Sequence, residues 1–458
     1  MKRKVPEGAN TSSTTEVQSD DSYCFKSPAL SFQLHTPRDT EFRARAASIH
    51  LPHGVVRTPV FMPVGTKGSI KALSTKQLKG VWNELDEDVD DICPEIILGN
   101  TYHLASQPGT PLLAELGGLH KFMNWRKNLL TDSGGFQMVS LLKLAQITEE
   151  GVKFNSPVDG TEMMLTPEES IKCQNEIGAD IIMQLDDVVS SVNPDFERFK
   201  EATARSVRWL DRCIQAHNRK DEQNLFGIIQ GGLDISPGGL RETCLQEMLL
   251  RDLPGYAIGG LAGGEDKDNF WRVVAHNAAR LPANKPRYLM GVGYPLDLVV
   301  CVALGVDMFD CVYPTRTARF GVALVPSGSI RLKSSDMAQQ MVPVEEGCPC
   351  TACQHYTRAF LHVMLKDNNA LASQLLTSHN IAYMMRLMRS MRKSILEGKT
   401  SHERFVKDFL HHQFPAGDVP MWVVQALTEG AGLTGIESTL IVTKNSTTTC
   451  NSIPEKVD

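Results

Sequence analysis

Eight short apolar segments constrain the fold of this chain more than any other feature. Each segment is rich in aliphatic and β-branched residues, and each ends in glycine or polar residues. They read TPVFMPVG, EIILGNTY, NLLTDSGG, DIIMQLDD, LFGIIQGG, GYAIGGLAGG, RYLMGVG and VDMFDCVYP. Such runs are typical of strands that are buried on both faces of a parallel sheet.

Segments with helical periodicity separate most of these runs. TPEESIKCQNEIG opens with a capping box from Thr166 to Glu169, and FERFKEATARSVRWLDRCIQAHN and KDNFWRVVAHNAARLP are amphipathic. Eight buried strands that alternate with helices predict an α/β fold, a (β/α)8 TIM-like barrel. A doubly wound open sheet is the structural alternative, but no Rossmann-type G-x-G-x-x-G follows the first strand.

A tight C-x-C-x-x-C pattern points to a metal. Its cysteines are Cys348, Cys350 and Cys353. A tetrahedral structural zinc site needs four ligands, so one is missing from the pattern. Three histidines follow it, His355, His362 and His379. His355 is disfavoured because it would crowd the Cys353 ligand. His362 lies in an amphipathic segment, where a surface histidine is the ordinary interpretation. Spacing alone does not choose among the three histidines.

The other cysteines and the charge narrow the class of protein. The chain has 11 cysteines, and those outside the pattern are scattered without disulfide-like regularity, which indicates reduced thiols and a cytosolic protein. No apolar run reaches membrane-spanning length, and the N-terminus lacks the apolar stretch of a signal peptide. The net charge of −6 gives no global basic field, so any nucleic-acid surface must be local.

The 458 residues are enough for one large barrel with an appended module. We expect a disordered segment over residues 1–28, a catalytic barrel over 29–340, a C-terminal zinc-binding subdomain with helices over 341–440 and a disordered tail over 441–458. Both ends are polar and rich in Ser and Thr. The acidic stretch 83–91 reads as a solvated surface loop.

In a barrel, chemistry lies at the C-terminal ends of the strands. The residues expected there are Asp132, Ser133, Asp186, Asp187, Gln230, Gly259, Gly260, Met290 and Asp310. Carboxylates, an amide, backbone amides and an apolar platform are the groups needed to bind a flat polar heterocycle. Two converging carboxylates can divide the nucleophile and acid/base roles, as in retaining glycosyl transfer. Taken singly, an Asp at a strand end more often caps a helix or forms an Asx turn.

The order of the motifs is more specific than any of them alone. TDSGGFQMVSL, MQLDDV, IIQGG, AIGGLAGGE, YLMGVG and DMFDCVYPTRTARFG precede the C-x-C-x-x-C. Over residues 30–435 the chain resembles the tRNA-guanine transglycosylase family, and within it the eukaryotic catalytic subunits. The resemblance implies a zinc-carrying TIM-like barrel. It also implies exchange of guanine for queuine at the wobble position of tRNAs with GUN anticodons, which serve aspartate, asparagine, histidine and tyrosine.

The resemblance also assigns roles to single residues. Asp310 would be the nucleophile that forms a covalent bond with the ribose, and Asp132 the general acid/base. His379 would be the fourth ligand of one structural Zn²⁺ per chain. The substrate-binding residues would be Asp132, Ser133, Gly134, Gly135, Phe136, Asp186, Gln230, Gly260, Gly263 and Met290. The RNA-binding residues would be Met290, Gly291, Val292, Gly293, Pro314, Thr315, Arg316, Thr317, Ala318 and Arg319.

The resemblance also implies how the base would be bound. Asp186 would accept from the N–H and amine of a guanine-like edge, Gln230 and the Gly260 N–H would bind its carbonyl, and Phe136 with Met290 would sandwich the ring. Buried polar groups left unpaired by a wrong base cost about 1–3 kcal/mol each. Bacterial relatives have valine where Gly263 stands, so this glycine should admit the bulky arm of queuine.

RNA contacts and partners complete the expectations. Arg386, Arg389, Arg392 and Lys393 recur at helical spacing and form a basic stripe suited to phosphates. The resemblance implies a heterodimer with a non-catalytic paralogous subunit in the cytoplasm, and leaves open peripheral association with the mitochondrial outer membrane. One alternative is that this chain is itself the non-catalytic tRNA-binding subunit, and another is a zinc-stabilised barrel that acts on a free nucleoside. Retention of Asp132, Asp186, Gln230 and Asp310 together favours the catalytic role.

Overall fold

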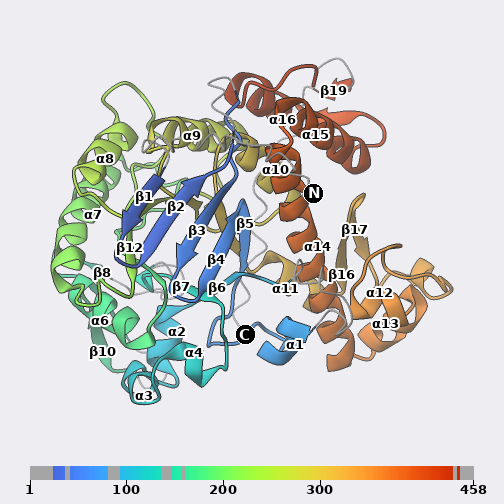
Figure 1. Ribbon diagram of the computed structural model, residues 1–458, viewed down its shortest axis with the longest axis horizontal. Helices are drawn as coiled ribbons and strands as arrows, with labels where there is room; N and C mark the ends of the chain where they lie inside the picture. Colours follow the sequence, from blue (N-terminus) through green and yellow to red (C-terminus); the bar gives the residue numbers. More distant parts are fainter. Residues whose placement is uncertain are drawn as a thin grey trace, which may run out of the picture.

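Eight parallel strands form a closed barrel at the centre of the molecule. The computed structural model describes residues 24–36, 42–80, 93–135, 146–155, 160–436 and 441–443 (Figure 1). The strands are β5 (Val60–Pro63), β6 (Ile96–Gly99), β7 (Asn128–Thr131), β11 (Ile181–Met183), β12 (Asn224–Ile229), β13 (Gly255–Ile258), β14 (Arg287–Leu289) and β15 (Met308–Cys311). They pair in the order β5-β15-β14-β13-β12-β11-β7-β6, and a parallel bridge from Val64 to Leu98 closes the ring. Each strand falls on one of the eight apolar runs, which confirms the predicted TIM-like barrel.

The inside of the barrel is apolar until the C-terminal ends of the strands. Buried side chains that include Met62, Leu98, Leu130, Ile228 and Met308 fill it. Because side chains alternate along a strand, the residue two positions beyond an inward-facing one also points inward. Those positions hold Asn100, Asp132, Gln230 and Asp310. The same alternation that builds the core therefore ends in a polar layer at the C-terminal end.

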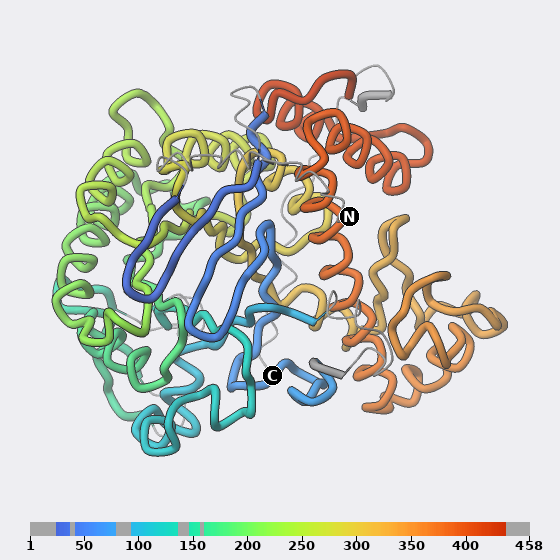
Figure 2. The backbone as a smooth tube through the Cα atoms, in the orientation of Figure 1, coloured from blue at the N-terminus to red at the C-terminus, as the bar shows by residue number. Residues whose placement is uncertain are grey.

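An antiparallel sheet covers the other end. It comprises β1 (Cys24–Ser27), β2 (Leu30–Leu34), β3 (Ala47–Leu51) and β4 (Gly54–Thr58), in that order. Its buried side chains belong to the same cluster as the barrel interior. Ser27 donates to Asn224 at the start of β12, and Arg45 pairs with Asp307 just before β15. The sheet therefore closes the barrel at the N-terminal ends of its strands, and Figures 1 and 2 show it lying across the barrel.

Two strands lie in segments that we expected to be disordered. β1 begins at Cys24, within the expected disordered segment 1–28, because its strand pairing and the packing of Phe25 on the barrel cluster hold it. β19 (Ile441–Thr443) lies within the expected tail and pairs with β18 (Asp418–Pro420). The acidic stretch 83–91 lies outside the described residues.

Helices surround the barrel. They are α1 (Thr75–Gly80), α2 (Thr101–Ser106), α3 (Thr110–Glu115), α4 (Leu119–Phe122), α6 (Pro167–Ile177), α7 (Phe196–Ala216), α8 (Leu240–Leu249), α9 (Lys267–Arg280), α10 (Pro295–Ala303) and α11 (Tyr313–Arg319). Thr166 caps α6 by accepting from the Glu169 N–H, as the predicted capping box requires. Asp195 and Asp266 cap α7 and α9 in the same way. Between β7 and α6 lies a small antiparallel sheet of β8 (Gln146–Ile147), β9 (Val152–Asn155) and β10 (Glu162–Leu165).

The C-terminal part is built around one long helix. It contains the hairpin β16 (Val322–Val325) and β17 (Gly328–Arg331), then α12 (Thr351–His355), α13 (Arg358–Lys366), α14 (Ala370–Leu396), α15 (Lys399–Gln413) and α16 (Met421–Gln425). The 27-residue α14 packs against α11, β16, α12 and β5, so it connects the cysteine-rich region to the barrel wall (Figure 2). Among the described residues, no helix is long and apolar enough to cross a membrane.

Candidate active site and metal centre

Asp310 presents one free carboxylate oxygen at the C-terminal end of β15. The Tyr288 hydroxyl donates to Oδ1 over 2.6 Å, and the Gly291 N–H donates to the same oxygen over 2.8 Å. No partner of Oδ2 exists among the described residues. Burial raises the pKa of Asp310, and the two hydrogen bonds oppose that rise. The carboxylate is thus oriented through one oxygen while the other can react.

Asp132 is held by the N-terminus of α2. Asn100, the N-cap residue of that helix, donates its side-chain amide to Oδ2 over 2.6 Å. The Thr101 and Gly134 N–H groups donate to Oδ1 over 2.9 and 3.2 Å. Gly134 has a φ of 81°, a conformation that favours glycine. The charge of Asp132 helps to raise the pKa of Tyr288, the donor to Asp310, so both carboxylates act on that hydroxyl group.

Asp186 and Gln230 form the next part of the site. The Gln230 Nε2 donates to Asp186 Oδ2 over 2.6 Å, and the Ser133 hydroxyl also bonds to Asp186. Burial, with the neighbouring Asp187, raises the pKa of Asp186 to about 7 against these hydrogen bonds. Asp186 therefore changes charge near neutral pH. One N–H of the Gln230 amide is engaged, and the second remains available for a ligand.

Asp187 has a structural role. The guanidinium of Arg198 and that of Arg205 both bind its carboxylate, the latter over 2.6 Å. This neighbour is therefore a fixed negative charge that helps to raise the pKa of Asp186.

Two buried charged residues that sequence reasoning missed hold the loops around Gln230. The guanidinium of Arg241, on α8, donates to the carbonyls of Ile229, Gly232 and Gly259 over 2.7–2.8 Å. Burial lowers the pKa of Arg241 to about 10. Glu265 is 2% exposed and accepts from the Ala262 and Gly263 N–H groups and from Ser191.

The glycines in these loops allow close approach. At Gly260, which has a φ of 66°, a Cβ would lie 2.4 Å from Gln230 Oε1. At Gly263 a Cβ would lie 2.8 Å from the Ser191 hydroxyl. A side chain at position 263 would therefore force the Ser191 loop to shift, so Gly263 lets these two loops pack closely in addition to the expected room for queuine.

The remaining expected site residues lie on three segments. Gly135 follows Gly134 at the end of β7, while Phe136 lies outside the described residues. Met290, Gly291, Val292 and Gly293 form the turn after β14, in which Met290 is half-buried and Val292 is buried. In α11 the side chains of Pro314, Thr315, Thr317 and Ala318 are buried, Arg316 is half-buried and Arg319 is exposed. The exposed charge of α11 is therefore carried by its two arginines.

Positive charge gathers beside Asp310. Burial, Arg319 and Arg316 lower the pKa of Lys71, in that order of effect. Burial and then Lys67 and Lys71 lower the pKa of His103. No ion pair of Lys71, Arg316 or Arg319 with a carboxylate exists among the described residues. Unneutralised cations near one another are typical of a surface that binds an anionic ligand. Sequence reasoning found Arg316 and Arg319 but not Lys71.

The three arginines of the expected basic stripe on α14 have partners within the chain, whereas Lys393 is exposed. Arg386 pairs with Glu345 over 2.6 Å, and Arg392 donates to the carbonyls of Ala47 and Thr58 in the N-terminal sheet. Arg389 donates to the Cys93 carbonyl. Arg389 and Arg392 therefore contact the barrel and its covering sheet, while Arg386 contacts the segment before the cysteines. Helical spacing in the sequence does not reveal that a helix face is covered in this way.

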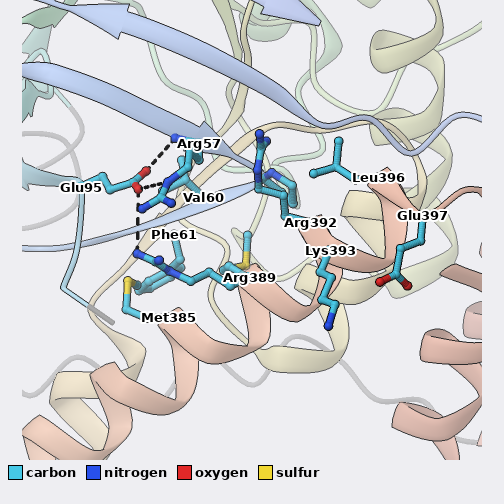
Figure 3. Close-up of a pocket in the computed structure, with 12 residues that line it drawn as sticks. Arg57, Val60, Phe61, Glu95, Met385, Arg389, Arg392, Lys393, Leu396 and Glu397 are labelled. Atoms are coloured by element: carbon cyan, nitrogen blue, oxygen red, sulfur yellow. Dashed lines mark hydrogen bonds and ion pairs between the residues drawn. The ribbon is translucent and has the colours of Figure 1, made fainter. Parts of the chain in front are cut away.

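Figure 3 shows where this face of α14 lies. Arg389, Arg392 and Lys393 line a cavity of about 320 Å³ between α14 and the start of β5, together with Arg57 and Glu95. Arg57 and Arg389 both point toward Glu95 there (Figure 3). The cavity is outside the barrel wall and away from Asp310.

The cysteine pattern and His379 form one cluster. His379 Nδ1 lies 3.7 Å from Cys348 Sγ, 3.5 Å from Cys350 Sγ and 3.3 Å from Cys353 Sγ. Tetrahedral zinc with Zn–S bonds of about 2.3 Å and a Zn–N bond of about 2.0 Å separates its ligand atoms by about 3.5 Å. The donor set and its spacing therefore fit a zinc-type ion. His379 Nε2 lies 2.8 Å from the Leu324 carbonyl, which leaves Nδ1 for the metal.

The other two candidate histidines are not in the cluster. His362 Nδ1 lies 2.8 Å from the Leu332 carbonyl, and His355 is exposed. The expectation of a Cys₃His set with His379 is confirmed.

Comparison with known proteins agrees with this geometry. Residues 39–415 match the family model described as queuine tRNA-ribosyltransferase. The queuine tRNA-ribosyltransferase catalytic subunit of Schizosaccharomyces pombe is 53% identical over 410 residues, which cover 87% of this chain and 96% of the relative. That of Caenorhabditis elegans is 47% identical over 84% of this chain and 95% of its own length. A queuine tRNA-ribosyltransferase of Thermus thermophilus is 45% identical over 85% of this chain and 96% of its own length.

Proposed function

The chain belongs to the queuine tRNA-ribosyltransferase family, and from this premise we propose that it is a tRNA-guanine transglycosylase. Its reaction replaces guanine with queuine at the wobble position of tRNAs with GUN anticodons. The observation that carries the proposal is the environment of Asp310, whose Oδ1 accepts two hydrogen bonds while Oδ2 has no partner among the described residues.

Asp310 attacks the anomeric carbon of the ribose in the first step. A bond forms between Oδ2 and that carbon, and the bond from the carbon to guanine breaks with its electron pair on guanine. Tyr288 and Gly291 hold the carboxylate in one orientation, so little freedom is lost when the reacting atoms meet. The second base then displaces the carboxylate, and two displacements retain the configuration.

Asp132 balances the protons. Guanine takes up one proton as it leaves, and the incoming base gives up one as it bonds to the ribose. A carboxyl group can donate in the first half and accept in the second half. Asn100, Thr101 and Gly134 orient Asp132 for this role, and the effect of its charge on Tyr288, the donor to Asp310, supports it.

Asp186, Gln230 and Gly260 recognise the base. The ionised Asp186 accepts from the ring N–H and the exocyclic amine, and Gln230 turns its second N–H to the carbonyl. Arg241 and Glu265 act as positioning residues, because they fix the backbone that carries Gln230 and Gly260. Gly263 leaves space for the larger arm of queuine. A base with the reversed donor pattern leaves these buried groups unpaired.

RNA binds over the same end of the barrel. Lys71, Arg316 and Arg319 lie there, so the positive charge is local even though the whole chain is acidic. Cys348, Cys350, Cys353 and His379 would hold Zn²⁺, and an ion with four protein ligands would supply folding stability. Because α14 carries His379 and also packs against α11, loading of this cluster would help to hold α11 in place.

The protein acts in the cytoplasm with a non-catalytic paralogous subunit. The names of the Schizosaccharomyces and Caenorhabditis relatives, which specify a catalytic subunit, support a complex with a second kind of chain. The alternative, that this chain is the non-catalytic tRNA-binding subunit, is disfavoured because Asp132, Asp186, Gln230 and Asp310 all lie at one end of the barrel.

The test is queuine exchange into an unmodified tRNA transcript with a GUN anticodon. The chain is assayed alone and with its paralogous subunit, and the first half-reaction is followed as an RNA–protein adduct that survives a denaturing gel. Asp310→Asn should abolish both adduct and exchange while tRNA still binds. Asp336→Asn, at an exposed carboxylate, is the matched control and should behave as the wild type. Binding of tRNA with no adduct and no exchange under any condition would establish the non-catalytic alternative.

A further inference from the structure

Two histidines and an aspartate meet at the opposite end of the barrel from Asp310. His53 lies in the turn between β3 and β4, His120 lies in α4, and Asp180 directly precedes β11. His53 Nδ1 is 2.7 Å from Asp180 Oδ1, and His120 Nε2 is 3.3 Å from Asp180 Oδ2. The two imidazole rings stack with centroids 3.6 Å apart. Three elements that are distant in sequence therefore place three metal-binding side chains together.

The cluster is buried on one side and open on the other. The side chains of Asp180 and His120 are 0% and 9% exposed, whereas that of His53 is 40% exposed. A cavity of about 320 Å³ adjoins His53 and is also lined by Gly54, Lys127 and Asn128. Asn128 Oδ1, in the wall of that cavity, is buried and has no hydrogen-bond partner among the described residues. Solvent or an ion can thus reach the cluster from the cavity.

We propose that His53, His120 and Asp180 bind one divalent transition-metal ion, with Zn²⁺, Ni²⁺ or Cu²⁺ as the class that suits this ligand set. Two imidazoles and one carboxylate are ligands that these ions share. The site has three protein ligands, so solvent from the cavity completes the coordination.

The distances need only a small adjustment. Bonds of about 2.0–2.2 Å in a tetrahedral site separate neighbouring ligand atoms by about 3.3 Å. His120 Nε2 and Asp180 Oδ2 already have that separation, and His120 Nε2 must give up its 3.1 Å contact with the Lys127 carbonyl to bind the ion. His53 must withdraw from Asp180 by about 0.6 Å and tilt away from the stacked ring, so that the ion lies near the plane of each imidazole. His53 is free to do so because it lies in a hairpin turn and is the most exposed of the three.

Asp180 is already positioned by the barrel. The Leu129 N–H donates to its Oδ2 over 2.8 Å, so the carboxylate cannot rotate away when a proton on His53 is exchanged for an ion. Metal binding displaces that proton, so affinity should rise as the proton becomes easier to remove.

The ion would join the N-terminal sheet to the barrel. His53 belongs to the β3–β4 hairpin, whereas Asp180 and His120 belong to the barrel and its α4 helix. Since ligands from all three elements meet, binding stabilises the folded state by mass action. The site has no contact with the residues of the proposed reaction, so base exchange should not depend on it.

The test counts metal ions on the full chain. The protein, with its Cys₃His cluster loaded, is dialysed against Zn²⁺ at up to about 100 µM and its bound zinc is measured, together with the temperature of unfolding. His53→Ala is compared with His50→Ala, which removes an exposed histidine from the same hairpin. We expect two equivalents of zinc in the wild type and in His50→Ala, and at least a tenfold weaker second equivalent in His53→Ala. The zinc-dependent rise in unfolding temperature should be lost only in His53→Ala.

Cobalt distinguishes the two sites if a variant folds poorly. Co²⁺ that occupies the second site of the zinc-loaded wild type should give visible bands without thiolate-to-metal charge transfer, because its ligands contain no sulfur. A single equivalent in the wild type would overturn the proposal. So would a second equivalent that His53→Ala retains, or cobalt bands that all carry the thiolate signature.

Discussion

The residues that flank β11 show how differently the two ends of one barrel treat a buried carboxylate. Asp180 precedes the strand and Asp186 follows it, and both are at most 5% exposed. Asp180 is bonded to two histidines, which lower its pKa below the ordinary value despite burial. Asp186 has the amide of Gln230 and the like charge of Asp187, so burial raises its pKa to about 7. Burial is common to both, and the partners decide the direction of the shift.

Strand β15 shows the same contrast in partners, although burial raises the pKa of both of its carboxylates. Asp307 precedes it and pairs with Arg45 over 2.9 Å, whereas Asp310 lies near its end and has only the neutral donors Tyr288 and Gly291. At the N-terminal end, buried carboxylates have cationic partners that hold the covering sheet. At the C-terminal end, Asp186 and Asp310 have neutral partners and so keep charge available for a ligand, whereas the carboxylate of Asp187 is taken by two arginines. The comparison separates structural from reactive carboxylates without reference to any relative.

The largest expected difference is in the rate of base exchange. Asp310→Asn should lower it by at least about 10³-fold, because the proposed nucleophile is lost, with little change in the temperature of unfolding. Asp180→Asn should leave the rate per folded molecule within about twofold. Single-turnover exchange, normalised to active protein, measures both. Equal losses in the two variants would contradict the separation of the two ends.

The next difference is in stability. Asp180→Asn should lower the free energy of unfolding by about 3 kcal/mol in urea without added metal, because the buried imidazole of His120 and the partly exposed imidazole of His53 lose their partner. Asp252→Asn is the matched control, since Asp252 pairs with Lys285 but its side chain is 86% exposed, and it should cost less than about 1 kcal/mol. Because the pKa of Asp180 is lowered, its contribution is present above about pH 4 and lost in acid. If the difference in free energy of unfolding between wild type and Asp180→Asn stays constant down to pH 3, the stabilising role of ionised Asp180 is refuted.

The contribution of Asp186 to stability should change with pH in the opposite direction to that of Asp180. Its pKa of about 7 lies above the ordinary value of 3.8, so its contribution to stability is complete in acid and is lost as the pH rises through 7. Asp186→Asn should therefore gain stability relative to the wild type between pH 4 and 8, at about 1.4 kcal/mol for each pKa unit. In the wild type, kcat/KM for the base should rise up to pH 7 and then level. Parallel stability profiles for variant and wild type would argue against the raised pKa.

The smallest effect concerns the positive rim beside Asp310. Arg316→Ala should weaken tRNA binding about tenfold and reduce the slope of log affinity against log salt by about 1. Arg404→Ala, at an exposed arginine of α15, should change neither quantity. Binding measured at several salt concentrations decides this, and equal slopes for the two variants would remove α11 from the RNA surface.

The strands of the barrel could be predicted because strands buried on both faces consist of short runs of aliphatic and β-branched residues. Inward-facing residues such as Asp132 and Asp310 follow from the same alternation. The fourth metal ligand was different, since spacing left His355, His362 and His379 open and only the resemblance chose among them. In the structure, packing of α14 against α12 decides the matter.

What the sequence hides depends on contacts between distant segments. Tyr288 reads as one more strand residue and Arg241 as one more helix residue, yet they bond to Asp310 and to three loop carbonyls. His53, His120 and Asp180 share no motif, so only the closed barrel brings them together. The intramolecular partners of the α14 arginines were hidden for the same reason. A solvated helix face and a packed helix face show the same residue spacing in the sequence.

The covering sheet limits how the bases can enter and leave the barrel. With the apolar interior filled and its far end closed by β1–β4, nothing can pass through the barrel along its axis. In the proposed reaction the departing guanine and the arriving queuine must use the single mouth over which the tRNA lies. Guanine therefore has to leave through this opening before queuine can enter. During that interval the proposed ester bond keeps the tRNA attached to the enzyme.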